Sequence, residues 1–437
     1  MTMKLPSWPS TDKERARRTR FTFLFHLRPV TLPARALRWS QTFGLGGSSL
    51  LLLILLAATG LLQMLVYQPV PGVAYDSVVS LERDVTFGPL IRGVHYWSAN
   101  LLVLVVLMHT ARVLLTGGHL GVRRFTWVLG AGLLLGVLAA SFSGYLLPWD
   151  QRSYWAVTIS TGMLTYVPWL GEALQRVVLG GPNVSDATLV NFYTLHTSIA
   201  PVALLLTAGW HFWRVRRAGG VVVPPVDSAD DEKVHFWPNL LVREIAQGLA
   251  VVALVLLLAA LLGAPLGDRA NAGMSPNPAK APWYFMGFQE LLIHFHPAFA
   301  VMVFPLLAVL GFVALPYLVP EGAAVGTWFL SSRGRRSTLL AAGLALVLTP
   351  ALVLVDEFAG AGPGNWLISG LVPMLAVAAV CGAFTVLIRR RLATDTAETV
   401  QAVAVLLSTA FLVLMIIGVW FRGAGMALTW PWTGGAA

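Results

Sequence analysis

Nine apolar segments of about 20 residues constrain the fold of this chain more than any other feature. A helix needs roughly 20 apolar residues to cross the hydrocarbon core of a bilayer. The chain is 57% hydrophobic and only 11% charged, which indicates a multi-pass membrane protein rather than a soluble one. We therefore predict an all-α membrane protein with about nine transmembrane helices. The predicted spans are residues 44–67, 93–116, 126–147, 194–213, 244–265, 298–318, 337–355, 366–388 and 399–421.

The basic residues gather on one side when these spans are threaded alternately across a membrane. That side receives the N-terminal segment, the end of the second span with Arg112, and the loops that contain Arg123, Arg333 and Arg389 or that begin at Arg214. By the positive-inside rule the N-terminus is cytoplasmic and the C-terminus lies outside. This distribution accounts for the excess of 30 basic over 20 acidic residues, so no nucleic-acid partner is expected. The N-terminal segment has no early apolar core, so we expect no cleaved signal peptide.

Four histidines form two matched pairs inside two of the spans. His95 and His109 lie 14 positions apart, and His196 and His211 lie 15 apart. At about 1.5 Å per residue each pair spans roughly 21–23 Å, with angular offsets of roughly 40° and 60°. Both spans run in the same direction, so His95 meets His196 near the outer face and His109 meets His211 near the inner face. Neutral imidazoles in this arrangement favour two bis-histidine haems and make these four residues the predicted iron ligands.

Glycines and the cysteine content bear on the same prediction. Gly47 and Gly60 in the first span, and Gly130 and Gly144 in the third, would let a flat macrocycle approach the backbone. Ordinary helix packing also uses glycine, so this observation alone does not decide. The single cysteine, Cys381, excludes a CxxCH covalent haem site and thiolate iron–sulfur ligation within this chain.

Four stretches and the paired histidines match a known family. They are LIRGVHYWSANLLVLVVLMHTARVLLTGG (90–118), SGYLLPWDQRSYWAV (143–157), TLVNFYTLHTSIAP (188–201) and APWYFMGFQE (281–290). Over about residues 36–320 the chain resembles cytochrome b of the quinol-oxidising bc and bf complexes. The 15-residue histidine spacing and WPNLLVREI (237–245) are similar to the bf type, whose quinol-site half is a separate small subunit. The chain resembles a fusion of the two halves.

The resemblance implies a division of the chain into five regions. These are a basic N-terminal segment (1–43), a four-helix dihaem cytochrome b domain (44–217), a cytoplasmic linker (218–239), a quinol-site two-helix region with the Trp-Tyr loop (240–320) and three C-terminal transmembrane helices (321–437). The long outer loops, residues 148–191 and 267–296, are expected to be irregular and to carry function.

The implied function is that of a dihaem subunit in a quinol:acceptor oxidoreductase with a cytochrome c-type acceptor. Electrons from quinol would pass between two non-covalent b-type haems, coupled to proton translocation. The implied setting is a bacterial inner membrane, with an iron–sulfur protein, a c-type cytochrome and a second copy of the chain as partners. The outer quinol pocket would be walled by Gly144–Trp155, Trp283 and Tyr284, and a quinone-reduction pocket would lie inside. Arg92 and Arg112 are the implied partners of the haem propionates.

Three departures from the family pattern matter. Pro282 replaces the glutamate of Pro-Glu-Trp-Tyr, Gly44 replaces the cysteine that holds an extra haem in bf proteins, and Asn191 replaces an arginine. We therefore expect no third, covalent haem. The nearest proton acceptors are Glu290 and Asp150, with His294 and His296 also close along the chain. Glu290 and His294 would share a helix face, and burial would raise the pKa of Glu290. The alternative is an acid–histidine pair that only anchors the loop.

Two other functions compete with this interpretation. A dihaem membrane anchor could pass electrons between quinone and another membrane-bound oxidoreductase, although such anchors lack the GYLLPWDQ and Trp-Tyr pair. A transporter with structural histidines would show no haem spectrum. A reduced-minus-oxidised spectrum followed by a quinol titration separates all three.

Overall fold

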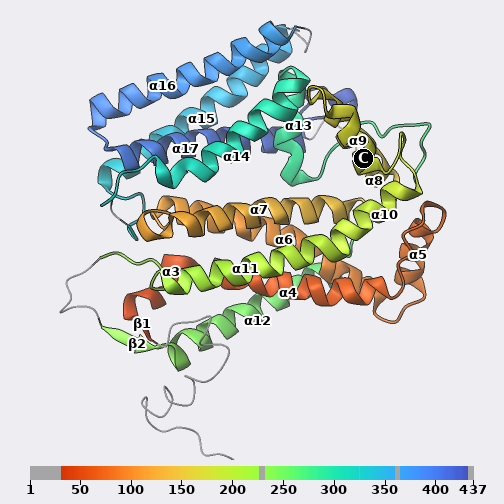
Figure 1. Ribbon diagram of the computed structural model, residues 1–437, viewed down its shortest axis with the longest axis horizontal. Coiled ribbons are helices and arrows are strands. Elements are labelled where there is room, and N and C mark those ends of the chain that lie inside the picture. The colour runs from red at the N-terminus through yellow and green to blue at the C-terminus, as the bar shows by residue number, and fades with distance from the viewer. Residues whose placement is uncertain (1–30, 226–231, 324, 360–364, 432–437) are drawn as a thin grey trace, which may run out of the picture.

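The computed structural model describes residues 31–225, 232–323, 325–359 and 365–431. Within these residues nine helices are long and apolar enough to cross a membrane, which confirms the predicted all-α membrane fold. They lie side by side in Figure 1. Their bounds are Leu45–Met64, Gly88–Leu115, Gly121–Tyr145, Asp186–Arg217, Phe236–Leu262, Phe299–Tyr317, Ser332–Phe358, Leu367–Leu392 and Thr396–Trp420.

The first four spans form one bundle that contains all four paired histidines. Its helices are α4 (Leu45–Met64), α6 (Gly88–Leu115), α7 (Arg124–Tyr145) and α11 (Ala200–Arg217), the last preceded by α10 (Asp186–Thr194). Helix α12 (Phe236–Leu262) packs against α6 and α4. The shared core is aliphatic, with Leu52, Val103, Val137, Leu204 and Val255 all buried.

The remaining helices form a second group, drawn above α7 in Figure 1. They are α13 (Met286–His294), α14 (Phe304–Ala314), α15 (Ser332–Ala359), α16 (Val372–Leu392) and α17 (Thr396–Trp420). Helix α17 packs closely against both α15 and α13. Buried alanines at 341, 345 and 402 let these helices approach each other, which is how apolar helices associate in lipid.

The two ends of the molecule differ. At one end, β1 (Thr31–Pro33) pairs antiparallel with β2 (Lys233–His235), next to α3 (Trp39–Thr42). The described ends of the N-terminal segment and of the linker therefore share one end, in agreement with the charge-based threading, while residues 1–30 and 226–231 lie outside the described residues. At the opposite end lie α5 (Pro71–Arg83), α8 (Gln151–Met163) and α9 (Gly171–Leu179) (Figure 1).

The outer loop over residues 148–191 is mostly helical, so the expectation of an irregular loop was wrong. Asp150 caps α8, and a Ser185–Thr188 capping box begins α10. Gly180 ends α9 in the left-handed conformation. Each short helix begins or ends at such a local signal, and these signals are weaker in the sequence than the apolar spans.

Three spans contain a five-residue π-helical stretch. They are Leu195–Ile199, Phe299–Val303 and Leu367–Leu371. Each is followed two residues later by a proline, at positions 201, 305 and 373. Proline has no N–H and its ring clashes with the preceding turn, so a widened turn relieves the helix at that point. The first of these stretches contains His196.

Candidate functional site

The rings of the outer histidine pair lie close together. The ring centroids of His95 and His196 lie 6.2 Å apart. A metal–imidazole nitrogen distance of about 2 Å on each side places two rings facing one metal about 6 Å apart, centre to centre. His196 Nδ1 lies 3.0 Å from the Ala140 carbonyl oxygen and 3.3 Å from Ser143 Oγ, and His95 Nδ1 lies 2.9 Å from Thr59 Oγ1. Partners on Nδ1 leave Nε2 free for a metal.

The inner histidine pair comes from the same two spans, at their other end. His109 on α6 lies near His211 on α11. Both pairs thus join the second and fourth spans, as the topology predicted. Their assignment as iron ligands stays a prediction.

A glycine faces each of the four histidines, and the absence of a side chain at these glycines leaves room for a flat group. A Cβ on Gly60 would lie 3.2 Å from His95 Cε1, and one on Gly130 would lie 3.4 Å from His211 Cε1. A Cβ on Gly144 would overlap the His196 ring. Any larger side chain would fill the space beside these imidazoles, so the residues present fit a haem at each pair.

The fourth glycine is Gly46, not the predicted Gly47. A Cβ on Gly46 would lie 3.5 Å from His109 Cε1, whereas one on Gly47 would face Glu244 Oε1 at 4.0 Å. One residue turns a helix by about 100°, so the two glycines face different neighbours. The signal was present in the sequence, because 46 and 60 repeat the 14-residue spacing of 130 and 144.

The π-helical stretch explains the unequal histidine spacing. His196 lies in Leu195–Ile199, where the widened turn accommodates one extra residue. The 15-residue separation of His196 and His211 is therefore equivalent to the 14-residue separation on α6. Spacing alone predicted an offset of roughly 60°, because a regular helix was assumed.

The two predicted propionate arginines are buried and already bound by the protein. Arg92 pairs with Glu82 and donates to the carbonyl oxygens of Ala264 and Pro265 at 2.8 and 2.7 Å. Arg112 Nε donates to the Gln41 carbonyl oxygen at 2.7 Å. Each arginine ties a span to a loop from elsewhere in the chain, and their role toward haem stays a prediction.

The Trp-Tyr segment packs against α6 and α7, while its role as a pocket wall stays a prediction. Trp283 Nε1 donates to Asn100 Oδ1 on α6 at 2.8 Å. Phe285 packs against Phe142 on α7, with ring centroids 5.8 Å apart. Tyr284 joins the bundle core, and burial raises the pKa of its hydroxyl. The Trp-Tyr segment therefore closes the outer end of the bundle between α6 and α7.

Asp150 is held as a helix cap, which weakens its candidacy as a proton acceptor. Its Oδ1 accepts from Ser153 N at 2.9 Å and from Ser153 Oγ at 2.6 Å. Its Oδ2 accepts from Gly267 N at 2.8 Å. The buried carboxylate thus joins α8 to the loop after α12.

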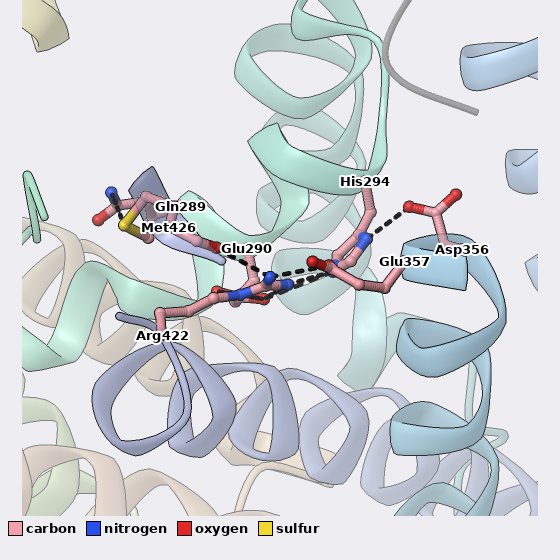
Figure 2. A network of polar contacts seen from close by, with 7 residues as sticks. All are labelled: Gln289, Glu290, His294, Asp356, Glu357, Arg422 and Met426. Atoms are coloured by element: carbon pink, nitrogen blue, oxygen red, sulfur yellow. Dashed lines mark hydrogen bonds and ion pairs between the residues drawn. The ribbon is translucent and has the colours of Figure 1, made fainter. Parts of the chain in front are cut away.

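Glu290 is fully buried, but it does not face the Trp-Tyr segment. It contacts α17 at Gly418 and forms a bidentate pair with Arg422, whose Nη2 lies 2.9 Å from Glu290 Oε2 (Figure 2). Burial would raise the pKa of Glu290, but hydrogen bonds from His294 and Arg422 outweigh it and lower the pKa. The expected raised pKa was wrong, because sequence reasoning did not bring Arg422 to this helix.

Comparison with known proteins now places the chain in a class. The family model described as cytochrome b/b6/petB matches residues 33–219. Cytochrome b6 of Synechococcus sp. (strain JA-3-3Ab) is 42% identical over 177 residues, which covers 40% of this chain and 81% of that protein. Cytochrome b6 of Porphyra purpurea gives the same values. The chain belongs to the cytochrome b/b6 family, and membership implies that it binds b-type haem.

A solved structure extends the similarity over the rest of the fold. A chain titled hyperthermophilic respiratory Complex III matches with a TM-score of 0.65 over 94% of this chain and 99% of that chain. The sequences are 21% identical, so this likeness concerns the fold alone. It extends well beyond residue 219, where the match to the family model ends.

Proposed function

We propose that this chain is the dihaem, quinol-oxidising subunit of a membrane electron-transfer complex. The observation that carries the proposal is the opposed pair His95 and His196, with both Nδ1 atoms occupied by protein groups and a glycine beside each ring. Two haems at the two pairs would supply one-electron transfer across the low-dielectric layer.

The chain's own residues would bind and orient these groups. His95 and His196 hold the outer haem and His109 and His211 the inner one, while the four facing glycines leave room for the flat rings. Arg92 and Arg112 are positively charged and buried at opposite ends of α6, where carboxylate side groups of the haems would reach the polar layers. Both haems are non-covalent, because Gly44 replaces the cysteine of the bf type.

Quinol would bind at the outer end, where the Trp-Tyr segment meets α6 and α7. Quinols are apolar and arrive through lipid, so aromatic walls such as Tyr284 and Phe285 suit them and exclude water. A quinone-reduction pocket would lie at the inner pair. The proposed division of the chain places the haem domain at 44–217, the linker at 218–239 and the quinol-site region at 240–320.

The wider proposal concerns partners and setting. The complex would include an iron–sulfur protein and a c-type cytochrome as outer electron acceptors, with a second copy of this chain. It would reside in a bacterial inner membrane with the basic loops in the cytoplasm. Proton release outside and uptake inside would couple electron transfer to proton translocation.

Haem content and quinol response test this function together. The purified chain should contain two haems per polypeptide by pyridine haemochrome assay, and a denaturing gel stained for haem peroxidase activity should show no band. Adding a reduced quinol should produce the b-type reduced spectrum. One haem per chain, a stained band or no reduction by quinol would each contradict part of the proposal.

A further inference from the structure

Five charged or titratable side chains meet at the outer end of the second helical group. Glu290 and His294 come from α13, Asp356 and Glu357 from α15, and Arg422 follows α17 (Figure 2). The arrangement joins three elements that are far apart in the sequence. A buried cluster of this size is costly unless every member has a partner, and here each one has.

Exposure rises along one branch of this cluster. The Glu290 side chain is 0% exposed, that of His294 is 8% exposed and that of Asp356 is 40% exposed. The three side chains are linked in that order, with His294 Nε2 lying 3.4 Å from Glu290 Oε2 and His294 Nδ1 lying 2.7 Å from Asp356 Oδ2. The branch therefore leads from the interior to the surface.

The His294 ring has a suitable partner in either protonation state. When the ring is neutral, Nδ1–H donates to Asp356 and Nε2 accepts from Arg422 Nη2 at 3.2 Å. When Nε2 takes a proton, Glu290 Oε2 is the acceptor within reach. Neither of these two states leaves a buried nitrogen without a partner, so the cluster can hold the ring both neutral and protonated.

We propose that His294 and Asp356 form the last part of the route by which protons from quinol oxidation leave the protein on the outer side. The proposal rests on the proposed function, and it identifies residues of this chain as the proton path of that site. Arg422 and Glu357 lie on the other branch and hold Glu290 in place.

The proton step balances without any redox change in the relay. Oxidation of a quinol to a quinone releases two protons and two electrons, and the electrons go to a haem and an iron–sulfur acceptor. A proton that reaches the Glu290 end forms an N–H bond at His294 Nε2. The N–H bond at Nδ1 then breaks and an O–H bond forms on Asp356, which loses the proton to water. The ring then carries its hydrogen on Nε2, and a half-turn of the imidazole exchanges the two nitrogens and restores the starting tautomer before the next proton arrives.

The electrostatics around His294 suit this role. The groups that face it are Glu290 on its own helix, Asp356 and Glu357 on α15, and Arg422 after α17. Lys280, in the preceding loop, interacts with Glu290. Burial would lower the pKa of His294, but hydrogen bonds to Glu290 and Asp356 outweigh it, so the pKa is raised above its ordinary value of 6.5. The imidazole therefore keeps its proton to a higher pH than an ordinary histidine does.

Two adjacent carboxylates provide a matched test. Asp356→Asn removes the exit station, whereas Glu357→Gln changes the neighbouring carboxylate, which contacts Arg422 and not His294. The complete complex would be assayed with a short-chain quinol and a soluble c-type cytochrome across the pH range. In the wild type, turnover should rise with pH as His294 loses its proton. We expect His294→Asn and Asp356→Asn to lower turnover about tenfold, a modest share of what general acid–base groups contribute.

The pH profile separates proton transfer from loop anchoring. The rising limb should disappear in His294→Asn and move to lower pH in Asp356→Asn, because the ring loses a carboxylate that raises its pKa. Glu357→Gln and His296→Asn should keep the wild-type profile. Equal effects of Asp356→Asn and Glu357→Gln, or unchanged profiles in His294→Asn and Asp356→Asn, would overturn the relay.

A second measurement keeps the relay distinct from the proposed function. An infrared pH titration of the purified complex should show an imidazole titration with a midpoint above 6.5 that His294→Asn removes. This readout does not depend on quinol turnover. Both haem spectra should be retained in Asp356→Asn, which leaves the Glu290–Arg422 pair intact. Absence of the titration would overturn the relay, whereas absence of quinol oxidation in the wild type would contradict the function instead.

Discussion

The two helical groups bury polar side chains in opposite ways. In the first group the four histidines face glycines, and His95 and His196 have a hydroxyl and a carbonyl of neighbouring helices, Thr59 and Ala140, as polar partners. In the second group Glu290 and Arg422 are fully buried and neutralise each other directly. The first arrangement keeps space and lone pairs for a group from outside the chain. In the second arrangement the charged side chains pair with each other, so they fix how the helices pack and provide titratable groups.

The largest effect should come from removing one predicted iron ligand. His109→Leu should lower the haem content from two per chain to one, because a haem iron held on one side only is lost readily. The outer haem spectrum should persist, since His95 and His196 lie at the other end of the same spans. A pyridine haemochrome assay with a redox titration measures both quantities. Retention of two haems would break the assignment of the inner pair.

Removing Arg422 should destabilise the second group without removing haem. Arg422→Leu removes the bidentate partner of the buried Glu290 carboxylate, and breaking a buried pair typically costs about 3–5 kcal/mol. The thermal midpoint of the purified chain should fall markedly, while haem content before heating stays at the wild-type value. Arg176→Leu is the control, because that side chain is 68% exposed and its loss should cost little. Equal midpoints in the two variants would contradict the comparison of the two groups.

Alanine at the glycines that face histidines should perturb the nearby haem, and the effect should be larger where the added methyl group lies closer to the imidazole. Gly144→Ala places a methyl group against the His196 ring and should perturb the outer haem most, whereas Gly130→Ala meets His211 at 3.4 Å and should act less. Gly132→Ala is the control, because nothing lies within 4 Å of its Cβ position. The measurement is the absorption and redox midpoint of each haem. An effect of Gly132→Ala as large as that of Gly144→Ala would contradict the proposed pockets.

The smallest effect should be the pH dependence of stability in the second group. The pKa of Glu290 is lowered, so its contribution is full above about 4.5 and is lost as pH falls through the folded value. The pKa of His294 is raised, so its contribution is full below about 6.5 and is lost as pH rises through the folded value. The thermal midpoint should therefore be highest between those two values. Glu290→Gln should remove the acidic decline, and a decline of the same size in that variant would assign it to another group.

Sequence reasoning succeeded where a pattern repeats along one helix. Apolar length predicted all nine spans, and the spacing of the histidines predicted which pairs share an end. The prediction of Gly47 was wrong by one residue, because it accepted a 13-residue glycine spacing in the first span beside a 14-residue spacing in the third. It also treated the fourth span as regular, although Pro201 follows the widened turn around His196. Both errors concern rotation about a helix axis, which a single inserted or shifted residue changes by about 100°.

The sequence by itself determined the membrane fold, which loops are basic and which histidines lie at the same end of the bundle. It could do so because apolar length, charge and periodicity are properties of a single segment. Only the tertiary structure decided the partners of Glu290 and Asp150. Arg422 follows Glu290 by 132 positions and reaches it through the packing of α17 against α13. Gly267 reaches Asp150 in the same way, through the loop after α12. The state of a buried carboxylate depends on the donors that surround it in space, and no local pattern encodes a neighbour brought from another helix.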